Sequence, residues 1–285
     1  MGQVRIVTDG DAYLDPRWAR TLDITVVPLR VQVGDEIYQD KDGSHNEAVL
    51  ARMAQERVRP MVIGPTAEDL QRVYARLVRT TDTILSIHSS GKLSPIVQNA
   101  RLAATAFLGR CDITVLDSQT TSLGLGILVR EAARMAQAGY SMAQILRYLR
   151  GMISRIYFVM VTDTLDYLER SGRISASQSI LGTMLGIKPL LMMEEGEIIP
   201  AEKVRNREKG LDKLVEFIGE FPQVEEIAIL QPMSYPTDET VLLQERLSGL
   251  FPSLAPVPIL VYGPVLASHV GPDGLGLVVY EGMED

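Results

Sequence analysis

The chain holds one cysteine, Cys111, among its 285 residues. A lone cysteine excludes an intrachain disulfide framework, and the three histidines form no Cys/His pattern with the spacing of a zinc site. We therefore expect no metal and a reducing, cytoplasmic location. No run approaches the roughly 18 consecutive apolar residues of a membrane-spanning helix, and neither end resembles a secretion signal, so we expect no stable membrane insertion.

Positive charge is also scarce. The chain has 28 Lys and Arg against 36 Asp and Glu, a net charge of −8 and a pI of about 5.1. The resulting long-range field disfavours nucleic acids and anionic membranes as main partners. The chain has no GxxxxGK[ST] loop, and Gly124-Leu125-Gly126 lacks the third glycine of a dinucleotide fingerprint, so we expect no nucleotide cofactor.

The chain does contain an alternation of strand and helix patterns. Short apolar runs predict strands in the first half at Val4–Thr8, Ile24–Val33, Thr83–His88 and Ile113–Leu116. Amphipathic stretches lie between them, so the first half is predicted to be α/β. The second half begins near Arg155, and its patterns predict strands at 157–161, 226–230, 258–262 and 275–280, helices at 208–220 and 238–248, and a hairpin turning through Glu195-Gly196.

Small polar residues follow three of the predicted strands. Asp9-Gly10, Ser89-Ser90-Gly91 and Asp117-Ser118 come at carboxyl ends, where open parallel sheets bind ligands, although each also suits an ordinary turn. Ser94-Pro95 has the pattern of a helix N-cap followed by proline. A hydroxyl there lies beside free N–H groups and suits a carboxylate or phosphate, unless it only caps its helix.

Two features of the second half also suggest a ligand. His269 precedes a glycine-rich loop, Val270 to Gly276, and its imidazole can donate to an anionic head group; the alternative is a structural loop histidine. The segment Ile180 to Met193 holds one charge, Lys188, together with two glycines and three methionines. Flexible methionines suit an apolar slot of adaptable shape, and plain core packing explains the segment equally well.

Seven segments together resemble the DegV family, which includes the fatty-acid-binding subunits of bacterial fatty acid kinase. They are IVTDGDAYL from Ile6, VVPLRVQVGDEIYQD from Val26, SGKLSPIVQNA from Ser90, VLDSQTTSLGLG from Val115, DTLDYLERSGRI from Asp163, LGIKPLL from Leu185 and GPVLASHVGPDGLGLVV from Gly263. They span nearly the whole chain in family order.

The resemblance implies a two-lobed α/β fold, with a parallel-sheet lobe at residues 1–153 and a mixed-sheet lobe at 154–285. One long-chain fatty acid would lie between the lobes, with its carboxylate held by Ser94 and His269, and Ser90 is a third expected head-group residue. The residues expected along the acyl tunnel are Val62, Ile63, Ile180, Leu181, Met184, Leu185 and Gly186. The chain departs from the family at Val62-Ile63, where a threonine and a serine are usual, and an apolar side chain stands in place of the head-group threonine.

Basic residues form a second candidate surface. Arg170 and Arg173 flank a Ser-Gly turn, and an extended Glu202–Lys209 would present Lys203, Arg205, Arg207 and Lys209 on one face. A solvated face explains this pattern as well as docking does. The resemblance implies contact with the catalytic subunit of a fatty acid kinase, which assigns Arg170, Arg173, Lys203 and Arg205 to partner binding.

We therefore expect a carrier without catalytic residues, metal or cofactor, which presents the carboxylate of its fatty acid to a separate ATP-dependent kinase. Burial of about fifteen methylenes would supply on the order of 12 kcal/mol before ordering costs, so the head group need only orient the ligand. Two alternatives stay open. One is a serine acyl hydrolase or esterase that uses Ser94 and His269, although no G-x-S-x-G elbow occurs. The other is a binding protein for a different amphiphile.

Overall fold

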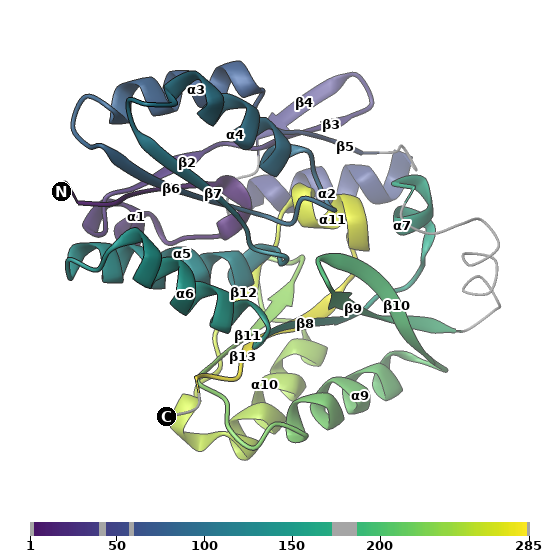
Figure 1. The fold of residues 1–285 in the computed structure, drawn as a ribbon. Coiled ribbons are helices and arrows are strands. Elements are labelled where there is room, and N and C mark those ends of the chain that lie inside the picture. The colour runs from purple at the N-terminus through teal and green to yellow at the C-terminus, as the bar shows by residue number, and fades with distance from the viewer. Residues whose placement is uncertain (1–2, 40–43, 57–59, 173–186, 284–285) are drawn as a thin grey trace. The chain divides into compact units, whose positions relative to one another are not determined.

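The computed structural model describes residues 3–39, 44–56, 60–172 and 187–283. The chain divides into two compact units (Figure 1). The first comprises residues 1–29, 63–154 and 195–197, and the second comprises residues 30–62, 155–194 and 198–285. These units differ from the expected lobes at residues 1–153 and 154–285, because residues 30–62 belong to the second unit and residues 195–197 to the first.

A four-stranded parallel sheet forms the centre of the first unit. Its order is β2-β1-β6-β7, with β1 at Arg5–Asp9, β2 at Ile24–Val27, β6 at Thr83–His88 and β7 at Asp112–Asp117. Val7 pairs with Thr25 on one side and Ser86 on the other, and His88 pairs with Asp117. All four strands therefore end at the same edge of the sheet.

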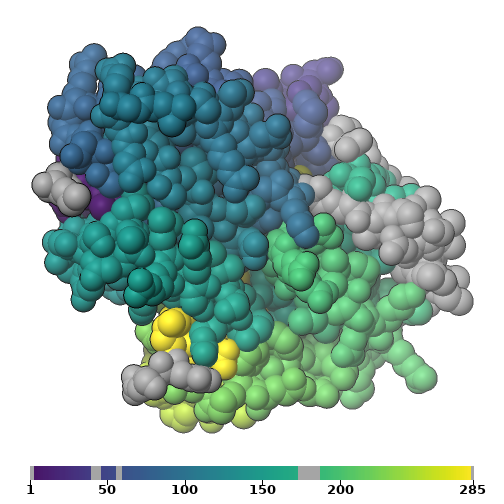
Figure 2. Space-filling view, in the orientation of Figure 1, coloured from purple at the N-terminus to yellow at the C-terminus, as the bar shows by residue number. Residues whose placement is uncertain are grey.

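Helices cover both faces of this sheet. Its helical segments are η1 at Gly10–Ala12, α1 at Pro16–Thr21, α3 at Ala67–Leu77, α4 at Ile96–Ala104, η2 at Thr105–Phe107, α5 at Ser122–Gln137 and α6 at Met142–Ile153. Helices α3 and α4 cover one face, and α5 and α6 lie on the other side (Figure 1). Val7, Leu70, Tyr74, Ile84 and Phe107 form much of the core on the α3/α4 face. In the space-filling view, blue and teal segments that include α3, α5 and α6 form the visible surface of this unit (Figure 2).

A six-stranded mixed sheet forms the centre of the second unit. Its order is β10-β9-β8-β13-β11-β12, with β8 at Ile156–Val161, β9 at Lys188–Glu194, β10 at Glu197–Val204, β11 at Glu226–Gln231, β12 at Ile259–Val261 and β13 at Leu275–Tyr280. Strand β13 is antiparallel to both β8 and β11, whereas β11 and β12 are parallel. The chain therefore has the predicted α/β fold, with a parallel sheet followed by a mixed one.

The second unit buries its sheet under two helices and adds a smaller layer. Leu211, Leu214 and Ile218 of α9, Arg207–Gly219, and Leu243 and Leu247 of α10, Asp238–Leu250, pack on the sheet. The smaller layer contains β3 at Arg30–Val33, β4 at Glu36–Gln39, β5 at Met61–Ile63 and α2 at Ser44–Glu56. The other helical segments are α7 at Asp166–Arg170, η3 at Pro252–Leu254 and α11 at Pro264–Val270, and α11 packs against α2, α7 and β3.

Two sequence predictions are wrong. The run Ile24–Val33 is not one strand, because β2 ends at Val27 and β3 begins at Arg30. Pro28 lies between them and has no N–H to continue the ladder. The segment Glu202–Lys209 is not extended either: β10 ends at Val204, and the Asn206 side chain caps α9 by accepting from the Lys209 N–H. Arg207 and Lys209 therefore lie on a helix and share no strand face with Lys203.

A pair of glycine substitutions tests the close approach of α5 to η1. A Cβ at Gly126 would lie within 2.3 Å of the Ala12 carbonyl oxygen, whereas one at Gly249 in α10 would meet nothing within 4 Å. We expect Gly126→Ala to lower the free energy of unfolding by about 1 to 3 kcal/mol through overpacking. Gly249→Ala should raise it by about 0.5 to 1 kcal/mol, because alanine favours helix. Urea unfolding midpoints measure both, and a gain in stability for Gly126→Ala would contradict this packing.

Candidate functional site

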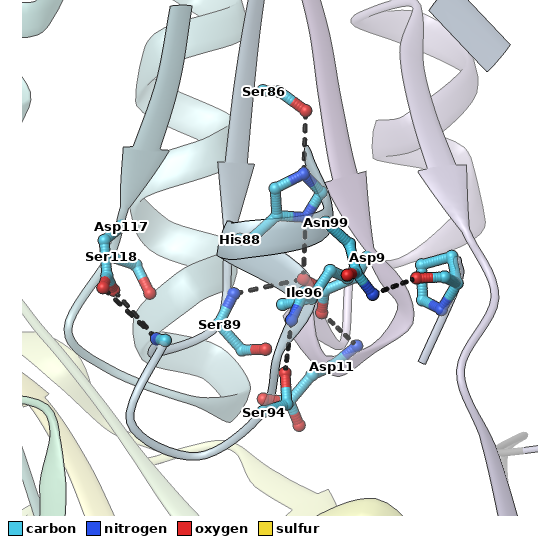
Figure 3. A network of polar contacts seen from close by, with 12 residues as sticks. Asp9, Asp11, Ser86, His88, Ser89, Ser94, Ile96, Asn99, Asp117 and Ser118 are labelled. Carbon is cyan, nitrogen blue, oxygen red and sulfur yellow. Dashed lines mark hydrogen bonds and ion pairs between the residues drawn. The ribbon is translucent and has the colours of Figure 1, made fainter. Parts of the chain in front are cut away.

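The carboxyl edge of the first unit's sheet collects buried polar side chains (Figure 3). Asp9 ends β1, Ser86 and His88 lie on β6, and Asp117 ends β7. Asp9, Ser86 and His88 are fully buried. Because parallel strands end at one edge, the turns that follow β1, β6 and β7 meet there.

The Asp9 carboxylate accepts three N–H groups. Its Oδ1 accepts from the backbone N–H of Asp11 at 3.1 Å. Its Oδ2 accepts from the Ser89 N–H at 3.1 Å and lies 3.0 Å from Nδ1 of His88. A buried carboxylate is tolerated where hydrogen bonds replace its lost hydration, and these donors supply them. Asp9 is thereby bonded to the last residue of β6 and to the first residue of the turn that follows it.

The network continues from His88 into the core. His88 Nε2 lies 2.8 Å from Ser86 Oγ, which accepts from the Tyr74 hydroxyl at 2.8 Å. Every contact is satisfied when His88 carries its proton on Nδ1 and accepts the Ser86 hydroxyl at Nε2, so we assign that tautomer from the network. Burial raises the pKa of Tyr74 to about 12, so this residue stays a neutral donor. The order Ser–His–Asp has the form of a catalytic relay, but Ser86 is enclosed and the chain of bonds supports structure.

Ser90 fixes the turn that follows. Its hydroxyl donates to the Gly196 carbonyl oxygen at 2.6 Å and accepts from the Lys92 N–H at 3.2 Å. Its carbonyl oxygen accepts from the backbone N–H groups of Leu93 and Ser94. Ser90 is fully buried, so its hydroxyl serves the turn in this conformation.

Ser94 ends the turn at the start of α4. The helix begins at Ile96 with Pro95 as its N-cap, one residue later than the sequence pattern predicts. The Ser94 Oγ accepts only a long bond, 3.4 Å, from the Ile96 N–H (Figure 3). The side chain is half-buried, and toward the described residues its hydroxyl donates no hydrogen bond. It therefore keeps a donor available beside the positive end of α4.

The loop after β7 is tied to η1, the segment that follows β1, by a second carboxylate. Asp11 accepts from the Thr121 hydroxyl at 2.5 Å and from the Ser122 N–H at 3.3 Å. Ser122 has a φ of +54°, which a non-glycine residue adopts only when its surroundings enforce it. The hydroxyls of Thr120 and Ser122 are buried without a protein partner among the described residues, a setting typical of an ordered water or a bound polar group.

His269 of the second unit lies in the last turn of α11 and is buried. The sequence predicts a loop from Val270, directly after His269, whereas α11 includes Val270 and the loop begins at Gly271, which has a φ of +94°. The Tyr262 hydroxyl holds this loop from both ends, because it donates to the Gly271 carbonyl oxygen at 3.1 Å and accepts the Gly274 N–H at 2.8 Å. Burial raises the pKa of Tyr262 well above its usual value, so the hydroxyl stays protonated.

A charged cluster holds the same loop from the other side. Arg207 donates to the Asp273 carbonyl oxygen at 3.0 Å and binds Glu239 at 3.0 Å. The Thr162 hydroxyl lies 2.9 Å from the Asp273 carboxylate, whose pKa is raised by burial and, secondarily, by Asp163. Arg207 was predicted to lie on a solvated or docking face. It instead bonds the loop that follows His269.

Of the remaining predicted site residues, some lie in the described part of the chain and others lie outside it. Val62 and Ile63 lie on β5 and are half-buried. The predicted tunnel residues outside the described part of the chain are Ile180, Leu181, Met184, Leu185 and Gly186, and the predicted partner residue Arg173 lies there too. Lys203 and Arg205 are exposed. Arg170 lies 5.9 Å from the centroid of the Tyr167 ring and 3.9 Å from Asp166.

Other classes of site receive no support from the described residues. Within the described ranges, no group of three or more His, Cys, Asp or Glu side chains could hold a metal ion. No helix in that part of the chain is both long and apolar enough to cross a bilayer. A surface hollow of about 770 Å³ lies at the opposite edge of the first sheet, where the β6 and β7 strands begin, and Asp82 and Asp112 in its wall disfavour a carboxylate.

The sequence indicates Asp9 as a ligand or turn residue and His88 as the end of a strand, but it does not reveal that the two side chains are bonded. The available signal was the period of two in β6, which places Ser86 and His88 on one face of an otherwise apolar strand. The β1–β6 register, with Val7 opposite Ser86, brings Asp9 to His88 two residues later. Sequence alone did not give this register.

Known proteins resemble this chain in both sequence and fold. A family model described as "Uncharacterised protein, DegV family" matches residues 3–282. A DegV domain-containing protein of Deinococcus radiodurans is 33% identical over 97% of this chain and 98% of its own length. Another, from Streptomyces coelicolor, is also 33% identical, over 97% of this chain and 98% of its own.

Solved structures agree with these relatives. A fatty-acid-binding DegV family protein from Thermus thermophilus is 31% identical, with a TM-score of 0.84 over 98% of this chain and 99% of its own. A DegV family protein from Streptococcus agalactiae, also described as fatty acid binding, is 24% identical over 99% of this chain and 100% of its own, and its TM-score of 0.87 supports the fold. The match of one family model to nearly all of the chain, joined by these relatives, establishes that the protein belongs to the DegV family.

Proposed function

We propose that this protein binds one long-chain fatty acid, with Ser94 and His269 as contacts of its carboxylate. The observation that carries the proposal is the Ser94 hydroxyl, which is half-buried, has a donor to spare and lies at the start of α4 on a turn held by buried hydrogen bonds. The Thermus thermophilus relative, described as binding fatty acid, adds support. Ser90 belongs to the same turn and contributes by holding its shape.

Hydrophobic burial supplies most of the proposed affinity. Each methylene removed from water contributes roughly 0.8 kcal/mol, whereas one neutral hydrogen bond contributes about 0.5 to 1.5 kcal/mol. The apolar side chains of Val62 and Ile63, together with the segment 180–186, are proposed to contact the acyl chain. A missing head-group threonine at this position is therefore a small loss beside the acyl contribution.

The protein is proposed to act as a cytoplasmic carrier and to leave phosphoryl transfer to a separate fatty acid kinase. The fully buried position of Ser86 closes the Ser86–His88–Asp9 relay to a substrate, which argues against catalysis by that relay. Arg170, Arg173, Lys203 and Arg205 are the proposed contacts of the kinase. Lys203 and Arg205 are exposed at the end of β10 and just beyond it, where a partner's acidic groups can reach them.

Head-group variants test the binding proposal. We expect Ser94→Ala and His269→Ala each to weaken binding of palmitic acid by about fivefold to tenfold, because each removes one donor to a carboxylate. Binding of hexadecanol, which has no carboxylate, should weaken by less than about twofold. Competition with a fluorescent fatty acid measures both ligands.

Ser154→Ala is the matched control for Ser94→Ala, because the Ser154 hydroxyl is exposed and donates to the Gly151 carbonyl oxygen of its own helix. It should leave both affinities unchanged. Equal losses for acid and alcohol in the Ser94 and His269 variants would show that the two residues do not bind the head group. Release of free acid from an added fatty ester at a rate abolished by Ser94→Ala would identify an esterase instead.

Charge reversal tests the partner surface. We expect the double variant Lys203→Glu/Arg205→Glu to reduce kinase-dependent phosphorylation of the bound acid by more than about tenfold, since two attractive charges become repulsive. Palmitic acid affinity should stay within about twofold of the wild type. Arg79→Glu, an exposed change on the first unit, is the control. Phosphorylation at the wild-type rate, or a loss of palmitic acid binding that accounts for the drop in phosphorylation, would contradict the assignment.

A further inference from the structure

We propose that Asp9 is a positioning residue for the ligand carboxylate, acting through His88 and Ser89 on the turn that carries Ser94. The inference rests on the proposed function and adds a residue that no ligand touches. Its basis is the set of three N–H groups that meet at one buried carboxylate (Figure 3).

The chemistry of this position calls for a pure acceptor. The Asp9 side chain is fully buried, and its contacts with the described residues are three donors: two backbone N–H groups and the Nδ1–H of His88. An ionised carboxylate accepts at both oxygens and donates nothing, so it satisfies all three. No other common side chain of this size does so. Aspartate therefore suits this position through its acceptor geometry, although a neutral residue would cost less to bury.

The connection from Asp9 to Ser94 is short and continuous. His88 and Ser89, which bond Asp9, come directly before Ser90 in the chain. The Ser90 carbonyl oxygen accepts the Ser94 N–H at 3.2 Å. A second carboxylate, Asp117, accepts the Gly91 N–H at 3.3 Å and so holds the middle of the turn. Asp9 fixes the start of the turn, where a small rotation about the backbone would displace the Ser94 hydroxyl most.

An isosteric substitution separates acceptor geometry from packing. In Asp9→Asn the amide oxygen can take the Oδ2 position and keep the His88 and Ser89 bonds, but the amide nitrogen then faces the Asp11 N–H. The opposite orientation loses two bonds and faces two donors. Either orientation places donor against donor in a buried site, and the turn must shift to relieve it.

Tyr74→Phe is the matched control. It removes the hydroxyl that donates to Ser86, at the far end of the same network, and leaves all three bonds of Asp9 in place. Both variants remove a buried hydrogen bond and both should lower the midpoint of thermal unfolding. Only Asp9→Asn disturbs the turn that begins at Ser89.

The experiment compares affinities for palmitic acid and hexadecanol in the wild type, Asp9→Asn and Tyr74→Phe. We expect Asp9→Asn to weaken acid binding by about tenfold and alcohol binding by less than about twofold, whereas Tyr74→Phe changes neither. Equal losses for both ligands in Asp9→Asn, or an unchanged acid affinity, would overturn the inference. A wild type that binds neither ligand would instead refute the proposed function.

A second pair of variants decides the matter if Asp9→Asn does not fold. The amide nitrogen of an asparagine overlays imidazole Nδ1, and that of a glutamine overlays Nε2. His88→Asn therefore keeps the donor to Asp9, whereas His88→Gln loses it and keeps a group beside Ser86. We expect His88→Gln alone to lower the ratio of acid to alcohol affinity by about threefold or more. The same ratio in both His88 variants would overturn the inference.

Discussion

The buried carboxylate of Asp9 is the constraint on which the first unit's polar edge depends. An ionised side chain inside a protein is stable only where donors surround it, and here the donors are parts of the turns that follow β1 and β6. Satisfying the charge therefore also fixes the backbone. The hydrogen bonds that offset the cost of burying Asp9 also hold the start of the Ser89–Ser94 turn in place.

The two units hold their candidate head-group residues by similar means. Ser94 lies on a turn fixed from within by Asp9 and Ser90, and His269 lies on a helix whose following loop is fixed by Tyr262 and Arg207. In each unit a buried polar group bonds backbone atoms instead of the ligand. Such preorganisation lets a weak polar contact orient a ligand whose binding energy comes from its hydrocarbon chain.

Much of the fold was predictable from the sequence because strand periodicity and turn chemistry agree locally. Thr83–His88 and Leu275–Tyr280 were predicted with their observed bounds, and Glu195-Gly196 forms the expected hairpin turn, with both residues at positive φ. The proline at position 28 was the signal that β2 and β3 are separate. The proline shows only where the strand breaks. No local signal in the sequence predicts that residues 30–62 belong to the second unit.

The candidate site was predictable only where one residue carries its own local signal. The Ser-Pro pair marked Ser94, and the glycine-rich loop marked His269. The Tyr74–Ser86–His88–Asp9 network depends on the β1–β6 register, which joins residues 79 positions apart, and on the packing of α3 against β6, so no local pattern reveals it. The prediction of one basic strand face over Glu202–Lys209 was wrong for a related reason. Asn206 caps α9, and Arg207 therefore lies on a helix and not on that face.

The most direct test of fatty-acid binding is mass spectrometry of lipid extracted from the protein purified without detergent. A long-chain fatty acid recovered in close to equimolar amount, and depleted in Ser94→Ala, is the predicted result. Protein that carries no lipid and takes up none when fatty acid is added would contradict the account, and so would stoichiometric recovery of an amphiphile that has no carboxylate.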